Sequence, residues 1–99
     1  MYYINMVFEW DNNKNEYNIA NHDGISFEFA IRVFLDEKRI EKYDWKHSTD
    51  IEDRWNVIGM VDDVLFVVYT ERKEHIRIIS ARKATKEEIN EYYNNYNLR

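Results

Sequence analysis

Arginine is the residue type in this chain whose spacing most clearly points to chemistry. Arg72, Arg77 and Arg82 recur at five-residue intervals near the end of the chain. A guanidinium stays charged at physiological pH, and its planar fork matches two oxygens of a phosphate. Arg77 stands out because it interrupts a run rich in isoleucine. Two roles are therefore open for Arg77: phosphate binding, or a structural ion pair with Glu71 or with a helix carboxylate.

The geometry of a β-strand limits which of these arginines can act together. Arg77 and Arg82 are an odd number of residues apart, so on a regular strand their side chains point to opposite faces. They can share a site only if a bulge or a strand end intervenes. Arg72 precedes an expected turn and is a candidate cross-strand neighbour of Arg77. Arg82 and Lys83 precede an expected helix, where they either bind phosphate or are merely solvated.

A histidine in a loop is the sequence candidate for transferring protons. His47 lies in a polar segment beside Ser48 and seven residues before Arg54. Because a histidine side chain titrates near pH ~6.5, it can accept and release a proton at neutral pH. A hydrogen bond that only orders the loop is the alternative role. His22 is expected to end a helix, and His75 is interpreted as a solvent-facing strand residue; the wide spacing of the three histidines predicts no zinc site.

The first third of the chain predicts a short strand and two helices. Residues 7–10 form the strand, and the helices cover residues 11–22 and 26–36. Each helix begins at a residue whose side chain can cap it, Asp11 or Ser26. The second helix has the clearer pattern, because its apolar residues recur at intervals of three and four and form one stripe. The residues of this stripe are Phe27, Ala30, Ile31 and Phe34.

The rest of the chain predicts strands and a closing helix. The candidate strands are residues 40–44, 55–59, 64–71 and 75–82. The second of these is expected to stop at Gly59, and turns are expected at residues 62–63 and 73–74 from spacing alone. Thr85 and Glu88 form a capping box for the last helix. The order predicts an α+β fold: a short N-terminal strand, two helices, an antiparallel meander of three to four strands and a C-terminal helix.

Length, composition and charge exclude several classes of protein. The 99 residues suit a single domain, 1–99, and the absence of cysteine excludes a disulfide scaffold and favours a cytoplasmic protein. We recognise no signal peptide, and the longest apolar run is far shorter than the ~20 residues of a membrane helix. The net charge of −5 argues against purely electrostatic binding of nucleic acid. Residues 72–99 nevertheless hold seven Lys and Arg against four Asp and Glu, which is compatible with a locally basic surface.

An ordered set of motifs resembles the BrnT toxins over about residues 6–93. The set comprises Phe8-Glu9-Trp10-Asp11, the run from Gly24 to Phe34, His47-Ser48, Asp53-Arg54 and the stretch from Tyr69 to Thr85. The last stretch is the most specific part. The chain departs from the family pattern at three places: the lysine usual before His22 is lost, Glu37 stands where proline is common, and Lys73-Glu74 replaces a glycine.

The resemblance implies a RelE-like fold and a metal-independent endoribonuclease without a cofactor, which cleaves RNA and arrests growth. It also implies a BrnA-like ribbon–helix–helix antitoxin that neutralises the toxin, and we expect a 2:2 hetero-complex. DNA is expected to be contacted only through the antitoxin, and a membrane is not an expected partner. The alternative function is a catalytically weak binding module that complexes the antitoxin and tunes promoter repression.

Metal-independent RNA cleavage needs a base for the 2′-hydroxyl, a donor that stabilises the phosphorane and an acid for the leaving 5′-oxygen. The catalytic candidates are His47, Arg54, Arg72 and Arg77. The RNA-binding candidates are Lys14, Arg82 and Lys83, and no metal ligands are expected. Lys14 and Asn18 lie four residues apart on the first expected helix, where they form either a joint polar site or an ordinary surface pair.

Overall fold

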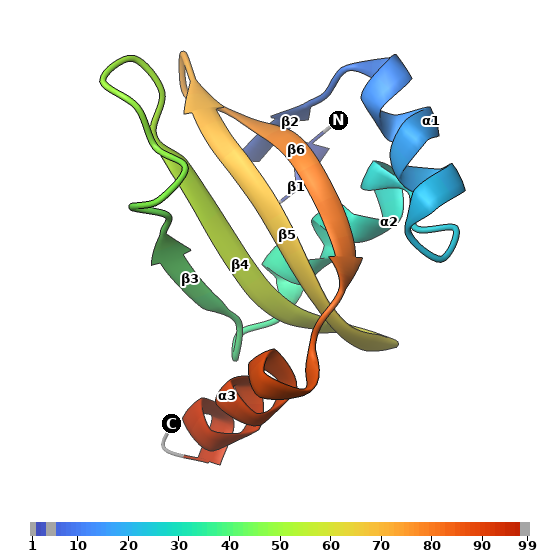
Figure 1. The fold of residues 1–99 in the computed structure, drawn as a ribbon, viewed down its shortest axis with the longest axis vertical. Coiled ribbons are helices and arrows are strands. Elements are labelled where there is room, and N and C mark those ends of the chain that lie inside the picture. Colours follow the sequence, from blue (N-terminus) through green and yellow to red (C-terminus); the bar gives the residue numbers. More distant parts are fainter. Residues whose placement is uncertain (1, 4–5, 98–99) are drawn as a thin grey trace.

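A mixed β-sheet lies at the centre of the molecule (Figure 1). The computed structural model describes residues 2–3 and 6–97, with side chains for residues 6–95. Within these residues, six strands pair in the order β1-β2-β6-β5-β4-β3. Their bounds are β1 Tyr2–Tyr3, β2 Met6–Glu9, β3 Ile40–Tyr43, β4 Arg54–Val61, β5 Asp63–Arg72 and β6 His75–Lys83. Strands β3 to β6 form the predicted antiparallel meander, and β2 joins β6 in parallel.

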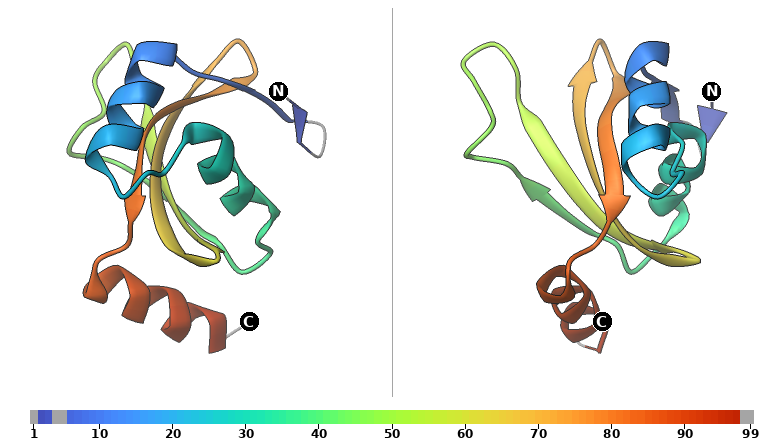
Figure 2. Two further views of the ribbon diagram at one scale, coloured as in Figure 1. Left: turned by 90° about the vertical axis from the view of Figure 1, so that its right-hand side faces the viewer. Right: turned by 45° about the vertical axis from the view of Figure 1, so that its right-hand side comes forward.

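The helices lie where the sequence predicts them, so the α+β class is confirmed. Their bounds are α1 Asn12–Asn21, α2 Phe27–Ala30, the 3-10 helix η1 Ile31–Leu35 and α3 Lys86–Asn97. Figure 2 shows α1 and α2 on one side of the sheet and α3 beyond one of its ends. Asp11, Ser26 and the Thr85–Glu88 box make the capping hydrogen bonds that the sequence predicts.

The main hydrophobic core fills the space between the sheet and residues 27–35. The predicted apolar stripe is confirmed, since all four of its residues are buried against β-strand side chains such as Leu65 and Val67. The second predicted helix is less regular than expected, because after Ala30 it tightens from an α-helix into η1.

Gly59 lies inside β4 and does not end it, so the prediction of a strand stop there is wrong. A glycine is needed at this position of the strand because η1 approaches the sheet closely there. A Cβ at Gly59 would lie 3.0 Å from the Cβ of Val33 and 3.2 Å from its carbonyl oxygen. The missing side chain therefore lets the helical layer pack tightly on the strand.

The turn predicted at residues 73–74 is confirmed, whereas the one predicted at 62–63 is tighter than expected, because Asp63 already pairs with Val61 and only Asp62 lies between the strands. Lys73 and Glu74 have φ of 50° and 69°, and Asp62 has φ of 62°. Consecutive left-handed residues suit the twist of a two-residue hairpin. Each non-glycine residue in this left-handed conformation adds backbone strain of about 1–3 kcal/mol. The pairing of the flanking strands must offset this strain.

A β-bulge interrupts the pairing of β5 with β6. Tyr69 pairs with Ile78 and Val68 with Ser80, so Ile79 is an extra residue on β6. Two residues after the bulge, Ala81 is held by a side chain from α1. The Asn18 amide donates to the Ala81 carbonyl at 2.8 Å and accepts from the Ala81 N–H at 3.0 Å.

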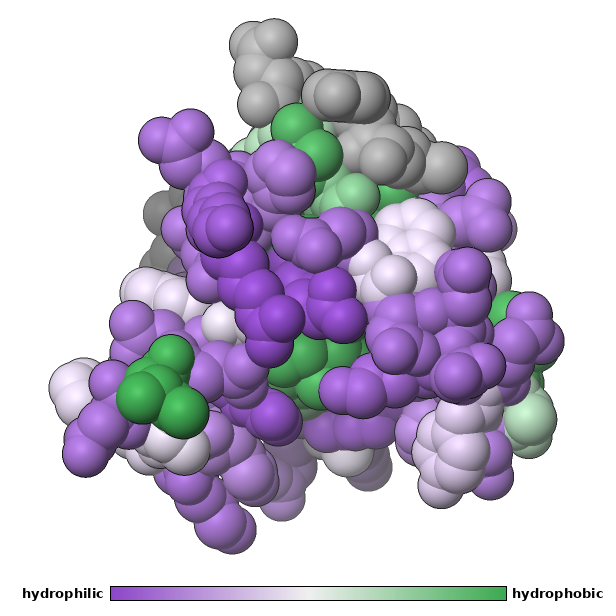
Figure 3. Space-filling model, turned by 90° about the horizontal axis from the view of Figure 1, so that it is seen from above, coloured by the Kyte–Doolittle hydropathy of each residue, from purple (hydrophilic) through white to green (hydrophobic). Residues whose placement is uncertain are grey.

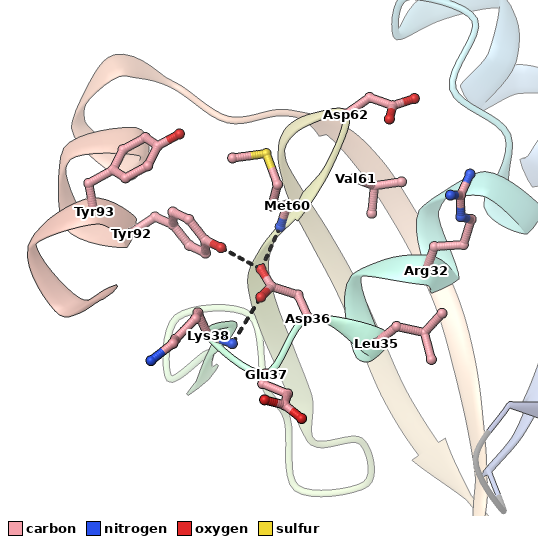
Figure 4. Close-up of a pocket in the computed structure, with 10 residues that line it drawn as sticks. All are labelled: Arg32, Leu35, Asp36, Glu37, Lys38, Met60, Val61, Asp62, Tyr92 and Tyr93. Carbon is pink, nitrogen blue, oxygen red and sulfur yellow. Dashed lines mark hydrogen bonds between the residues drawn. The ribbon is translucent and has the colours of Figure 1, made fainter. Parts of the chain in front are cut away.

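One buried tyrosine helps to fix helix α3 to the fold. Tyr92 belongs to the same buried apolar cluster as Ile58 on β4, and its hydroxyl donates to the Asp36 carboxylate at 2.6 Å. The backbone N–H groups of Lys38 and Met60 donate to the same carboxylate (Figure 4). Asp36 therefore joins η1, β4 and α3 at one point.

Asn18→Ala should destabilise the fold, because it leaves backbone groups of Ala81 without their partner. A buried group left unsatisfied costs about 1–3 kcal/mol, so the free energy of unfolding from urea titration should fall by at least that amount. Asn21→Ala is the matched control, since the Asn21 amide bonds the Tyr17 carbonyl on the exposed surface of the same helix. A loss no larger than that of the control would contradict this role of Asn18.

Candidate active site

The bulge decides which arginines share a face of the sheet. Directly paired antiparallel residues point to the same side. Arg77 pairs with Thr70 before the bulge, and Arg82 pairs with Phe66 beyond it. Because Thr70 and Phe66 are an even number of residues apart, Arg77 and Arg82 lie on the same face. Ile79 therefore supplies the bulge that the sequence analysis required for a shared site.

We call this side of the sheet the open face, because the core with α2 and η1 lies on the other side. The open face consists of Arg54 and Asn56 on β4, Val68, Thr70 and Arg72 on β5, and His75, Arg77, Ser80 and Arg82 on β6. Residues of helix α3 pack with the apolar residues at one end of the same side, among them Ile58 and Phe66. Apart from the buried Thr70, the open-face side chains are half-buried or exposed, so a ligand can reach them.

Glu9 joins β2 to the open face. The parallel register sets Glu9 beside Arg77, whose Nη1 donates to Glu9 Oε2 at 3.0 Å. The second carboxylate oxygen, Oε1, lies 3.5 Å from Nδ1 of His75. Arg77 thus has an ion pair, as the sequence alternative allowed, but its partner is Glu9. Glu71 pairs with Ile76 and so points to the opposite side of the sheet.

Glu52 holds two more arginines at one end of the open face. Its Oε1 accepts from Arg54 Nε at 2.9 Å, and its Oε2 accepts from Arg72 Nη2 at 3.5 Å. The hydrogen bond from Arg54 is the main reason that the pKa of Glu52 is lowered, against the opposing effect of burial. The carboxylate therefore stays ionised and draws Arg54 and Arg72 together.

Arg82 is held in place from two directions. Its guanidinium carbon lies 4.1 Å from the ring centroid of Phe66, and two of its nitrogens donate to Glu88 at 2.8 and 3.0 Å. Burial opposes ionisation of Glu88, but hydrogen bonds from Arg82 and Thr85 outweigh it, and the pKa of Glu88 is lowered overall. The same glutamate thus caps α3 and orients an open-face arginine.

On the open face, four guanidinium groups form ion pairs with three carboxylates. The arginines are Arg54, Arg72, Arg77 and Arg82, and the carboxylates are Glu9, Glu52 and Glu88. A guanidinium has five N–H donors, and a carboxylate contact uses only one or two of them. The remaining donors can bind a phosphodiester and stabilise negative charge that develops on it.

The structure places the two predicted RNA-binding lysines outside the open face. Lys14 is exposed on α1. Lys83 pairs with Leu65 and points to the core side of the sheet, where its Nζ lies 3.7 Å from Asp63. Asn18 is only 2% exposed and bonds β6, so it forms no joint surface site with Lys14.

His47 lies in the loop between β3 and β4, and its side chain is 60% exposed. Its Nδ1 lies 2.9 Å from a carboxylate oxygen of Asp44, and its backbone N–H donates to the other oxygen. Burial opposes ionisation of Asp44, but these hydrogen bonds lower its pKa overall. The described contacts of His47 match the loop-ordering role that the sequence analysis kept as the alternative.

Three side chains of the candidate site were not predicted from the sequence: Glu9, Glu52 and His75. The sequence did contain a signal for His75. Residues 75 and 77 of one strand must share a face, so His75 had to lie on the same side as Arg77. Glu9 had no such signal, since the parallel pairing of β2 with β6 joins distant parts of the chain. Glu52 precedes Arg54 by two residues in a loop, where alternation does not apply.

Arg72 lies between two cavities at the end of the sheet. One, of about 580 Å³, is lined by Glu52, and the other, of about 540 Å³, is lined by Glu9 and His75. Figure 3 shows this end of the molecule from above, and its surface is mainly hydrophilic. A larger cavity of about 650 Å³ lies between α3 and η1 (Figure 4), but its carboxylate, Asp36, is already engaged in holding α3. The surroundings of Arg72 suit a polar ligand better.

Comparisons with known proteins identify the family to which this chain belongs. The family model described as "Ribonuclease toxin, BrnT, of type II toxin-antitoxin system" matches residues 10–88. The chain belongs to the BrnT family. Among solved structures it is similar to the ribonuclease toxin BrnT of Brucella abortus, with 26% sequence identity and a TM-score of 0.61 over 82% of this chain and 99% of that one. No curated protein matches the chain significantly.

Family membership confirms the resemblance that the motifs indicated. The BrnT family consists of ribonuclease toxins of type II toxin–antitoxin systems, which implies an antitoxin partner. The structural match agrees with the observed order of strands and helices. Among the described helices, none combines the length and the apolar character needed to cross a bilayer.

Glu88→Gln should lower the stability of the protein at neutral pH. Because the pKa of Glu88 is lowered in the folded state, its ionised form stabilises the fold above the ordinary glutamate value of 4.5. This contribution is lost as the pH falls through the lower, folded-state pKa. The urea midpoint of the variant should therefore lie below that of the wild type at about pH 7, and the gap should shrink toward about pH 3.

Glu87→Gln is the matched control for this experiment, because Glu87 is an exposed neighbour in the first turn of α3. Its midpoint should follow the wild type at every pH. Equal midpoints of Glu88→Gln and wild type at neutral pH would contradict the role assigned to the Arg82–Glu88 pair.

Proposed function

We propose that the chain is a metal-independent endoribonuclease toxin that cleaves RNA at the open face and thereby arrests growth. The family consists of ribonuclease toxins. The observation that carries the proposal is the convergence of Arg54, Arg72, Arg77 and Arg82 on one accessible face of the sheet. Arginine suits this task because its fork binds phosphate oxygens and keeps its charge.

Arg72 and Arg77 hold the scissile phosphate in this proposal. They are diagonal neighbours on paired strands, a separation of roughly 7–8 Å between backbones that long side chains can bridge. Their free N–H donors stabilise the extra negative charge of the phosphorane. Arg54 shares Glu52 with Arg72 and supports the same phosphate, and Arg82 binds a neighbouring phosphate of the RNA strand.

A catalytically weak binding module is the second candidate function. The observation that favours it is that each of the four open-face arginines already contacts a carboxylate. In that case the face binds the antitoxin, and the complex tunes repression of its promoter. A cleavage assay separates the two candidates directly.

We also propose the partner and the compartment. The antitoxin is a BrnA-like ribbon–helix–helix protein, whose own dimerisation gives a 2:2 complex and which alone contacts DNA. The complex forms in the cytoplasm, where the RNA substrate lies. To neutralise the toxin, the antitoxin must cover or distort the open face, so its contacting segment is acidic or amphipathic.

Purified protein should cleave RNA in the presence of EDTA, and Arg77→Lys should abolish most of this activity without lowering the melting temperature. Lysine keeps the charge of Arg77 but not its fork. Loss of such a donor costs about 2.7–4 kcal/mol in the barrier, or roughly 100- to 1000-fold in rate. Arg32→Lys is the matched control, because Arg32 is exposed on η1 beyond the core side of the sheet.

The other possible results of the cleavage assay each contradict part of the proposal. RNA left intact by the wild type favours the binding module. Cleavage that requires a divalent ion contradicts the metal-free mechanism. A lower melting temperature of Arg77→Lys with full cleavage makes Arg77 a structural partner of Glu9.

Antitoxin binding should protect backbone amides in residues 72–96 from hydrogen exchange. This segment contains the turn between β5 and β6, the whole of β6 with Arg77 and Arg82, and nearly all of α3. Amide exchange is measured on the toxin with and without its co-expressed antitoxin. Protection confined to residues 11–36, with 72–96 unchanged, would place the antitoxin on the other side of the sheet and contradict the proposed interface.

A further inference from the structure

We propose that His75 is the base of the reaction at the open face and that Glu9 positions it. The inference rests on the ribonuclease activity proposed above. His75 pairs directly with Arg72 and shares its face with Arg77, the two arginines assigned to the scissile phosphate. A base must lie beside the phosphate whose adjoining 2′-hydroxyl it deprotonates. Among the histidines, His75 is the one whose position meets this condition.

The geometry around His75 fits this task. Its side chain is 46% exposed, so a ribose can reach it. It lines the cavity of about 540 Å³ together with Glu9, Arg72 and Lys73. Glu9 Oε1 lies 3.5 Å from the His75 Nδ1 atom, which leaves Nε2, on the other side of the ring, for the substrate.

Glu9 is itself held in place. Its Oε2 accepts from Arg77 Nη1 at 3.0 Å, and its backbone is fixed by the parallel register of β2 with β6. A carboxylate at Nδ1 of a histidine favours the tautomer that carries its proton there and keeps a lone pair on Nε2. Glu9 thus acts through His75, as a positioning residue.

The charged groups around His75 come from three strands and the hairpin turn. Glu9 on β2 is negative, whereas Arg72 on β5, Lys73 in the turn and Arg77 on β6 are positive. The three cations attract the phosphate to the cavity, and the carboxylate stabilises the imidazolium that forms when His75 takes a proton.

The proposed step conserves protons and electron pairs. The 2′-oxygen attacks the adjacent phosphorus while its proton moves to Nε2 of His75. The P–O5′ bond breaks, and its electron pair leaves with the 5′-oxygen, which takes a proton from water. The products are a 2′,3′-cyclic phosphate and a 5′-hydroxyl, and His75 returns its proton to the hydroxide left by that water.

The test compares histidine variants of the full chain on mixed-sequence RNA oligonucleotides in EDTA. His75→Asn should cleave at least about 100-fold more slowly, the lower range for loss of a general base. Its melting temperature and its binding of 2′-O-methyl RNA should match the wild type, and mass spectrometry should identify the cyclic phosphate in wild-type products. His22→Asn is the matched control, since His22 ends α1.

Glu9→Gln tests the positioning role by separating kcat from KM. Without the carboxylate beside Nδ1, the imidazole loses the partner that fixes its orientation and tautomer. The kcat of the variant should therefore fall, while its KM and its binding of 2′-O-methyl RNA match the wild type. A purely structural Glu9 would lower the melting temperature and leave kcat unchanged at a temperature where the variant is folded.

The two proposals fail in different ways. Full cleavage by His75→Asn, or loss of cleavage in His47→Asn instead, overturns the assignment of His75 while the ribonuclease proposal stands. Intact RNA with the wild-type protein overturns the ribonuclease proposal and the base together.

Discussion

The hydrogen bonds between the Asn18 amide and the backbone of Ala81 hold β6 beside its bulge, and the arrangement of the open face depends on that register. Without the extra residue Ile79, Arg77 and Arg82 would point to opposite sides of the sheet. The same amide donates to the Ile25 carbonyl, so α1, the loop after it and β6 are tied together. One buried asparagine thus links the helical layer to the placement of the arginines.

Charge balance is the second constraint on the site. The open-face arginines are neutralised in part by Glu9, Glu52 and Glu88, which agrees with a chain whose net charge is −5. The carboxylates keep the arginines ordered before a ligand arrives, so less side-chain entropy is lost on binding. Under the proposed function they also make the open face selective, because a phosphodiester must bind each guanidinium more strongly than the carboxylate does.

Local patterns in the sequence predicted most of the fold. The stripe from Phe27 to Phe34 and the Thr85 capping box depend on residues close in the chain, and both are confirmed. Long-range features were not predictable: the pairing of β2 with β6, the bulge at Ile79, and the contact of η1 with Gly59. For the site, the shared face of Arg72 and Arg77 was predicted, whereas Glu9 and Glu52 were not. The RelE-like relationship of the fold stays a prediction.

Binding of RNA at the open face can be tested by NMR, by mapping the changes in amide chemical shift that 2′-O-methyl RNA causes. The modified RNA keeps its phosphates but lacks the attacking hydroxyl, so the complex persists during the measurement. If RNA binds the open face, the largest shifts should fall on Arg54, Arg72, Arg77 and Arg82, with small shifts at Lys14. Shifts concentrated on α1 and around Lys14, with the four arginines unchanged, would contradict it.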